Sequence, residues 1–211
     1  MTDRFSDVRR QLVEVCRRLY ARGLIAGADG NVSVRLGPGR LLVTPSGVAK
    51  GDLTEDDLIE ISPTGEPRRA GRMPSREVAI HLRIYARRPD VMAVVHAHPP
   101  IATGFAVAGE PLPAAVLPEL IVQMGTVPLI PYDTPGTLAL AARFDPYLDS
   151  HDAFLMANHG AVTVGPSLAA AHHRMESVEH CARILLTAKL LGRVNELTPE
   201  HVAILLGGEA V

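Results

Sequence analysis

The stretch AVVHAHPPIATG, residues 93–104, decides how the rest of the chain is arranged. Its first half is apolar and β-branched, which is typical of a buried strand. Two prolines then end the strand and favour a short helix through Ala108. Side chains alternate along a strand, so His96 and His98 share one face, with Cα atoms roughly 6.5–7 Å apart. Two imidazoles placed in this way either bind one metal ion or remain two solvated residues at a strand end.

Strands and helices interleave on both sides of this stretch. Apolar or alternating runs predict a hairpin at NVSVRL and LLVTP, a further strand at LIEIS, and two strands, AFLMAN and AVTVG, around a tight NHG turn. Helical periodicity covers residues 7–22, 75–88, 136–149 and 167–192. The links between paired strands are of hairpin length. We therefore expect an α/β fold with a mixed, mainly antiparallel sheet packed between helices.

Length and composition predict one domain over residues 1–211, with a core from about residue 8 to residue 192. The formal net charge is −2, aromatic residues make up 4% and tryptophan is absent, which argues against a nucleic-acid partner. No apolar run approaches the roughly 18 to 20 residues of a membrane span, and no apolar export segment opens the chain. Cys16 and Cys181 have no neighbouring cysteine, so a reducing, cytoplasmic compartment is expected.

A zinc-type site with one open position needs three protein ligands, and His96 and His98 supply two. His159 is the best third candidate, because a hairpin turn projects it from a rigid base and Gly160 adds backbone freedom. The remaining histidines are interpreted as structural, with an exposed or capping role expected on the long helix: His81, His151, His172, His173, His180 and His201.

Six motifs stand in order along the chain: GADGNVSVRL, TPSGVAKGDL, MPSREVAIH, VVHAHP, PYDTPGT and NHG. With these motifs the chain resembles the class II aldolase/adducin family, whose members include L-fuculose-phosphate aldolase and L-ribulose-5-phosphate 4-epimerase. The resemblance implies an α/β/α sandwich and a homotetramer with active sites at subunit interfaces. It also implies a divalent ion, Zn²⁺ first and Mn²⁺, Co²⁺ or Fe²⁺ as alternatives, held by His96, His98 and His159. Glu77 would be the acid/base carboxylate.

The resemblance further implies a binding site for a substrate phosphate group. The residues that match it are Gly30, Asn31, Ser46, Gly47 and Ser75. Such glycines let backbone N–H groups approach an anion closely, and Ser75 is the expected N-cap of a helix with Glu77 in its first turn. Arg76 replaces a second serine that sugar-phosphate aldolases often carry. An arginine there either binds phosphate or carboxylate, or points outward to an interface.

We expect a retro-aldol cleavage of a ketose 1-phosphate, similar to fuculose phosphate or a deoxy- or methylthio-pentulose phosphate, to glycerone phosphate and an aldehyde. The charge left by cleavage forms an enediolate that a metal ion would stabilise, and Glu77 would move the proton with a pKa tuned upward. Neither Lys50 nor Lys189 lies in a motif for an imine-forming lysine.

In the aldolase prototype a hydroxyl group stands at the position of Ala28, and a tyrosine stands near the position of Leu117. This chain has neither group, and Tyr132 is expected to pack instead. These departures leave several alternatives open. One is other sugar-phosphate chemistry on the same scaffold, namely epimerisation, dehydration or decarboxylation. A second is an adducin-like binding domain without catalysis, and a third is a three-histidine metal hydrolase.

Overall fold

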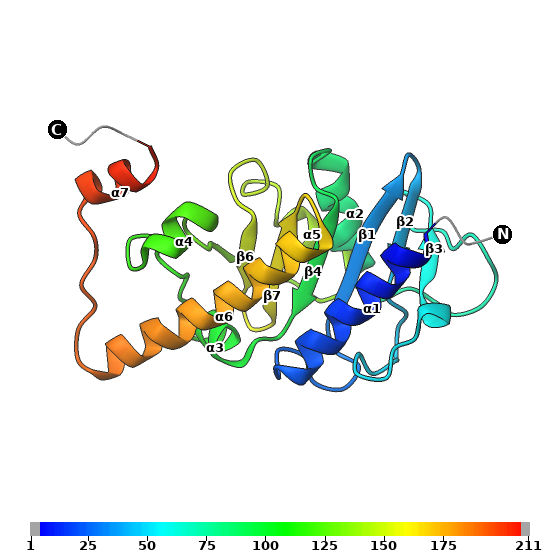
Figure 1. Cartoon of the computed structure of the whole chain (residues 1–211), viewed down its shortest axis with the longest axis horizontal. Coiled ribbons are helices and arrows are strands. Elements are labelled where there is room, and N and C mark those ends of the chain that lie inside the picture. Colours follow the sequence, from blue (N-terminus) through cyan, green and yellow to red (C-terminus); the bar gives the residue numbers. More distant parts are fainter. Residues whose placement is uncertain (1–4, 208–211) are drawn as a thin grey trace.

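The computed structural model describes residues 5–207, which form a seven-stranded sheet with helices on both faces (Figure 1). The order across the sheet is β3-β2-β1-β4-β7-β6-β5. The strands are β1 (Asn31–Gly37), β2 (Arg40–Val43), β3 (Ile59–Ile61), β4 (Ala93–Ala97), β5 (Leu129–Ile130), β6 (Ala153–Met156) and β7 (Gly160–Gly165). Within the described range only β5 and β6 pair in parallel, so the predicted mixed, mainly antiparallel sheet is confirmed. The expected domain spans residues 1–211, of which 1–4 and 208–211 lie outside the described residues.

The helices form one layer on each face of the sheet. Their bounds are α1 (Ser6–Ala21), α2 (Val78–Arg87), α3 (Pro100–Ala108), α4 (Pro118–Gln123), α5 (Leu138–Ala142), α6 (Leu168–Leu190) and α7 (Pro199–Leu205). Apolar side chains of α1, α3 and α6 share one core cluster with the sheet, and those of α2 and α5 share another. This arrangement is the expected α/β/α sandwich. Figure 1 shows α7 at one end of the molecule, near α4, which it contacts.

Strand β4 lies in the middle of the sheet between β1 and β7, and its residues alternate between the two cores. Ala93, Val95 and Ala97 pack in the cluster of α1 and α6, whereas Val94 packs in the cluster of α2. Full burial of an apolar side chain as large as valine stabilises the fold by roughly 1.5–3 kcal/mol, so this alternation determines which face each residue takes. His96 consequently points to the α2 side of the sheet.

Most of the predicted helices agree with the structure, including the short helix that ends at Ala108, and one differs in length. The expectations for residues 7–22 and 167–192 match α1 and α6 within one or two residues. The expectation for residues 136–149 is wrong in length, because α5 ends at Ala142 and the chain continues in tight turns. Pro146 has no N–H and disfavours helical backbone at the preceding residue, which accounts for the early end. The sequence patterns do not predict the helices α4 and α7 or the strand β5.

The start of α2 also differs from the prediction. Its first residue is Val78, and Glu77 takes the N-cap position, so Ser75 is not the N-cap. The Ser75 hydroxyl instead accepts a hydrogen bond from the Glu77 N–H at 3.3 Å. His172 on α6 is 2% exposed, which corrects the expectation of an exposed or capping role. No helix in residues 5–207 combines the length and apolar character needed to cross a bilayer.

Candidate active site

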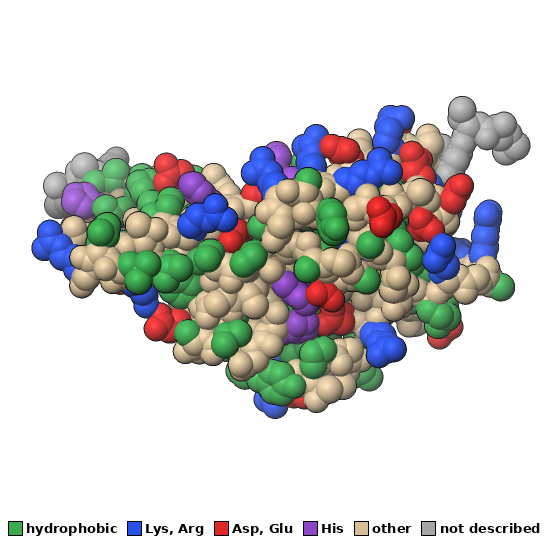
Figure 2. All heavy atoms as spheres, turned by 90° about the horizontal axis from the view of Figure 1, so that it is seen from below, with side chains coloured by type: hydrophobic (Ala, Val, Ile, Leu, Met, Phe, Trp, Pro, Cys, Tyr) green, Lys and Arg blue, Asp and Glu red, His purple; other side chains and the backbone are tan. Residues whose placement is uncertain are grey.

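Three histidines converge at the end of β4 and the start of β7. One ligand atom from each of His96, His98 and His159 lies within 4.8 Å of the others. The Nε2 atoms of His96 and His98 are 3.1 Å apart, as the shared strand face predicts, although β4 itself ends one residue before His98. Figure 2 shows histidine side chains beside acidic ones near the middle of one face of the molecule. The His96 side chain is buried and that of His98 is 28% exposed, so the cluster opens to solvent on one side.

The donor set fits a divalent cation. His96 Nδ1 lies 2.9 Å from the Ala161 carbonyl, and because a carbonyl can only accept, this nitrogen carries the hydrogen. With a metal ion bound, His96 Nε2 would present its lone pair to the ion, which is how an imidazole ligand is oriented by a carbonyl behind it. His159 Nδ1 is buried and has no hydrogen-bond partner among residues 5–207. Three imidazoles with one open side match the ligand number and type of a catalytic zinc-type site.

Glu77 lies against the same histidines. Its Oε2 atom is 3.1 Å from His96 Nε2, and its Oε1 atom is 2.9 Å from His159 Nε2. Asn31 Nδ2 donates a hydrogen bond of 3.0 Å to Oε2. This geometry follows from the fold, because Asn31 opens β1 directly opposite His96 in β4, and Glu77 ends the loop that leads into α2 on the same side of the sheet.

Burial favours the neutral form of the Glu77 carboxyl, but the adjacent His159 and His96 imidazoles outweigh burial and hold its pKa well below the usual range. The expected upward shift concerns a carboxylate beside a bound metal ion, so it stays a prediction. Burial, together with the neighbouring His96 and His159, lowers the pKa of His98 to about 4. A low imidazole pKa keeps the lone pair free for a metal ion at neutral pH.

The third histidine is placed by the turn between β6 and β7. Asn158 takes the left-handed conformation there, with φ of 56°, so Gly160 does not supply the backbone freedom assigned to it. The role of Gly160 is steric, because its missing side chain leaves room for β4 beside the hairpin. A Cβ atom at this position would lie 2.6 Å from both the Ala97 carbonyl oxygen and the Cδ2 atom of His98. The hairpin can approach β4 this closely only because residue 160 has no side chain.

The residues predicted to bind phosphate come from three neighbouring segments. Gly30 directly precedes β1 and Asn31 is its first residue, Ser46 and Gly47 form an exposed turn after β2, and Ser75 and Arg76 precede α2. Asn31 and Ser75 line one small cavity together with Thr44 and His81. The Ser46 N–H donates to the Met73 carbonyl at 2.9 Å, so this amide is already used within the chain. Ser46 can offer an anion only its hydroxyl group.

Three side chains of the site region show features that the sequence did not indicate, although His81 is structural as expected. Tyr132, expected to pack, is 56% exposed in a surface loop between two prolines. His81 is buried and its Nδ1 lies 2.6 Å from the Ser33 hydroxyl, which also lies 2.8 Å from the Tyr85 hydroxyl. Lys50 is buried beneath the loops of the site. Lys50 lies in a polar loop, and nothing in the neighbouring sequence indicates that its side chain is buried.

Comparison with known proteins places this geometry in a family. The description "Class II Aldolase and Adducin N-terminal domain" matches residues 10–186. The chain is 34% identical over 201 residues to the 3-oxo-tetronate 4-phosphate decarboxylase of Pectobacterium atrosepticum, covering 92% of this chain and 90% of that protein. It is 38% identical over 175 residues to the 5-methylthioribulose-1-phosphate/5-deoxyribulose-1-phosphate aldolase of Rhodospirillum rubrum, covering 83% and 78%.

The solved structures agree with the sequence relatives. A structure of L-fuculose 1-phosphate aldolase superposes with a TM-score of 0.88 at 33% identity, covering 95% of this chain and 94% of that one. The chain belongs to the class II aldolase/adducin family, and the resemblance carried by its motifs is confirmed. These relatives are enzymes that act on small sugar phosphates, and they include both a decarboxylase and an aldolase.

Proposed function

We propose that this protein is a divalent-metal-dependent aldolase that cleaves a ketose 1-phosphate to glycerone phosphate and an aldehyde. One observation carries the proposal above all: a carboxylate, Glu77, contacts two of three clustered histidines, and the third, His98, is 28% exposed. His96, His98 and His159 would hold the ion, most simply Zn²⁺. When bound, such an ion supplies Lewis acidity next to the carbon atom that loses its bond.

In the proposed reaction the chain itself supplies proton transfer and orientation. Cleavage of the C3–C4 bond leaves an enediolate whose C3 must gain a proton, and Glu77 would exchange the proton at this atom. It would deliver the proton to C3 in the cleavage direction and take it from C3 in the condensation direction. The Asn31 amide holds the carboxylate through one oxygen. Asn31, Ser46 and Ser75 would bind the substrate phosphate, with Gly30 and Gly47 allowing close approach, and Arg76 beside them adds a positive charge.

Decarboxylation of a 3-oxo-acid phosphate is the second candidate. Both reactions break a carbon–carbon bond and leave negative charge next to a carbonyl, so the same donor set serves either. Arg76 is the observation that favours decarboxylation: it is exposed, directly precedes Glu77, and makes no ion pair within the described part of the chain. A free guanidinium is well suited to a substrate carboxylate. The relative from Pectobacterium atrosepticum has this activity by name.

Product analysis tests the proposal. Purified protein reconstituted with Zn²⁺, and separately with Mn²⁺, Co²⁺ or Fe²⁺, is incubated with L-fuculose 1-phosphate, 5-deoxyribulose 1-phosphate, 5-methylthioribulose 1-phosphate and 3-oxo-tetronate 4-phosphate. We expect glycerone phosphate, detected by a coupled assay, from at least one ketose. Release of CO₂ alone would establish the decarboxylase. An epimer or dehydrated product would establish another reaction, and no turnover by metal-loaded protein would favour a binding domain.

We also propose that four copies assemble and complete each other's sites. Exposed apolar side chains support an interface at the end of the molecule that carries α4, α7 and the last turn of α6. They are Val122, Leu190, Leu191, Ile204 and Leu206. Apolar side chains gather over this end in Figure 2. Exposed apolar clusters of this kind mark association surfaces. The cytoplasmic location stays a prediction from the cysteine pattern.

A further inference from the structure

Lys50 is a cation with almost no contact with solvent. It is 1% exposed and is among the largest fully buried side chains of the described residues. Its Nζ donates hydrogen bonds to the carbonyl oxygens of Ala28 at 2.9 Å and Val48 at 3.0 Å. Its backbone N–H also donates to the Gly27 carbonyl at 3.1 Å. A buried ammonium is costly unless such partners offset the lost hydration, so these bonds hold the loops to the lysine.

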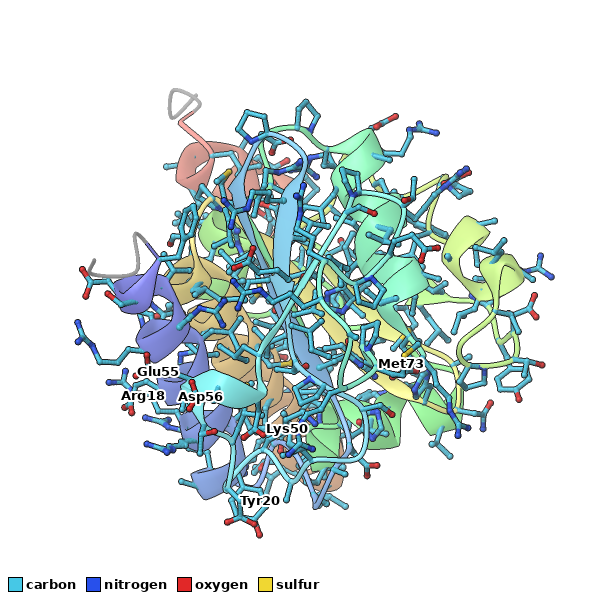
Figure 3. All side chains as sticks on the ribbon, turned by 90° about the vertical axis from the view of Figure 1, so that its right-hand side faces the viewer. Arg18, Tyr20, Lys50, Glu55, Asp56 and Met73 are labelled. Atoms are coloured by element: carbon cyan, nitrogen blue, oxygen red, sulfur yellow. The ribbon has the colours of Figure 1, made fainter. Side chains whose placement is uncertain are left out.

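The two loops that Lys50 joins carry four of the six residues proposed to bind phosphate. One loop leads from Gly27 through Gly30 to Asn31, and the other contains Ser46 and Gly47. Lys50 is the side chain that bonds to the carbonyl of Ala28 in the first and to that of Val48 in the second. Figure 3 shows Lys50 among the loops at the same end of the molecule as Tyr20.

The third segment of the site, which carries Ser75, is tied to the other two without Lys50. Pro45 and Pro74 form an isolated β-bridge, reinforced by the hydrogen bond from the Ser46 N–H to the Met73 carbonyl. The Asn31 side chain connects the first segment to the third by donating a hydrogen bond to Glu77. The three segments are therefore linked pairwise. The first two are joined by the Lys50 backbone N–H and by its buried ammonium group, and the ammonium group is the only side chain that bonds to both of them among the hydrogen bonds of the described residues.

The surroundings keep this ammonium directed at the loops. Burial lowers the pKa of Lys50, while the neighbouring Cys16 and Asp29 act in the opposite direction. The adjoining Gly51 packs so closely on the Tyr20 ring that a Cβ there would come within 2.7 Å of it, which fixes the backbone at Lys50. An ammonium has three donors, and two are used by the carbonyls.

We propose that Lys50 is a positioning residue of the phosphate site. Its ammonium holds the peptide groups of Ala28 and Val48 so that the two turns present Asn31 and Ser46 to one phosphate group. It also contributes positive charge beneath that group. This inference rests on the proposed function, since it assumes that the turns bind a substrate phosphate.

The test compares Lys50→Met with a matched control. Lys189→Met removes the only other lysine of the chain, an exposed residue paired with Glu110. Inorganic phosphate is the binding probe, measured by calorimetry on the metal-loaded protein. For Lys50→Met we expect phosphate affinity to fall and KM to rise by about tenfold or more, with kcat within about threefold of wild type. Lys189→Met should match wild type. A fall in kcat at unchanged KM, or unchanged phosphate affinity, would overturn the proposal.

A measurement on the wild-type chain covers the case in which Lys50→Met does not fold. With two lysines in the sequence, ¹⁵Nζ-lysine labelling gives two signals, which Lys189→Met assigns. We expect titration with inorganic phosphate to shift the Lys50 signal and leave the Lys189 signal unchanged. If calorimetry detects phosphate binding but the Lys50 signal does not move, the role of Lys50 is wrong and the phosphate site stands. If phosphate does not bind at all, both the site and the role of Lys50 are wrong.

Discussion

At the scale of single residues, the site depends on how side chains from distant parts of the chain share one carboxylate. Glu77 is contacted by Asn31 from β1, His96 from β4 and His159 from the β6–β7 turn. None of these contacts is local in sequence. The carboxylate is therefore held from several sides, which is the condition for a general acid/base whose geometry must not change during turnover.

The exchange Glu77→Gln tests the acid/base role. Glutamine keeps the shape and the contact with Asn31 but cannot move a proton, so we expect kcat to fall by about 10²–10⁴-fold while bound metal stays near wild type. Steady-state kinetics and elemental analysis of the same preparation measure both. Glu119→Gln, an exposed acid on α4, serves as the control. A wild-type rate in the Glu77 variant would remove this residue from the mechanism.

His81 makes stability depend on pH. Burial lowers its pKa to about 3, whereas an imidazole in the unfolded chain titrates near 6.5. Between these values the unfolded state binds a proton that the folded state does not, so the free energy of unfolding decreases as the pH falls from 6.5 towards 3. The slope expected from this residue is at most about 1.4 kcal/mol per pH unit.

The exchange His81→Asn isolates that contribution, because asparagine can still bond to Ser33 at the position of the ring Nδ1. We expect a lower overall stability but a flatter pH dependence. Urea denaturation of both proteins at pH 5 and pH 7 measures the difference. Equal slopes in the two proteins would show that His81 is already protonated, or exposed, in the folded state.

At the scale of elements, the three-histidine cluster requires the β6–β7 hairpin to lie very close to β4. The two strands β4 and β7 are paired over five residues, from Ala93 with Gly165 to Ala97 with Ala161. The last pair places His159 next to the end of β4. Ligand geometry is thus set by strand register, and a shift of one residue would turn His96 to the opposite face.

The exchange Gly160→Ala tests this close approach. The added methyl group would lie 2.6 Å from a backbone oxygen and from the His98 ring, so the hairpin must move away. We expect a loss of about 1–3 kcal/mol in the free energy of unfolding together with weaker metal binding. Chemical denaturation and a metal titration with a competing chelator measure both effects.

Gly104→Ala is the matched control for that exchange. Gly104 lies inside α3, where an added Cβ atom would meet no described atom of the surroundings within 4 Å. An alanine in a helix is more stable than a glycine by roughly 0.5–1 kcal/mol. The control should therefore raise stability and leave metal affinity unchanged. Similar behaviour of the two variants would contradict the steric role of Gly160.

At the scale of the whole molecule, the end that carries α4 and α7 differs from the rest. In the described part of the chain α7 has no buried residue, and Leu190 and Leu191 at the end of α6 are 80% and 83% exposed. A helix that contacts its neighbour α4 but has no buried residue gains little from its own packing, because tertiary burial supplies most helix stability. A second copy of this chain is the proposed cover.

The native mass tests this assembly. Light scattering coupled to size exclusion should give four times the 22.6 kDa mass of one chain. The double exchange Leu190→Glu and Leu191→Glu should lower this mass, since two charges would be buried at the interface. Leu138→Glu alters an equally exposed leucine, 80% accessible, on α5 and should not change it. A monomeric wild-type protein would contradict the proposed tetramer.

Much of this protein could be determined from the sequence because the deciding features are local. The two-residue period of a strand places His96 and His98 on one face whatever surrounds them, and the NHG turn between two β-rich runs presents His159. The helical period of α1 and α6 and the hairpin links of the sheet are local in the same sense. Motif order then indicated the family, which similarity to known proteins confirmed.

Only the tertiary structure decided how these local pieces meet. It placed β7 beside β4, brought Asn31 against Glu77, and lowered the Glu77 pKa where burial alone would have raised it. It also ended α5 early and buried Lys50 between two loops. These outcomes depend on contacts between residues far apart in the chain. Such contacts are chosen by the packing of the whole core, and no short stretch of sequence contains that information.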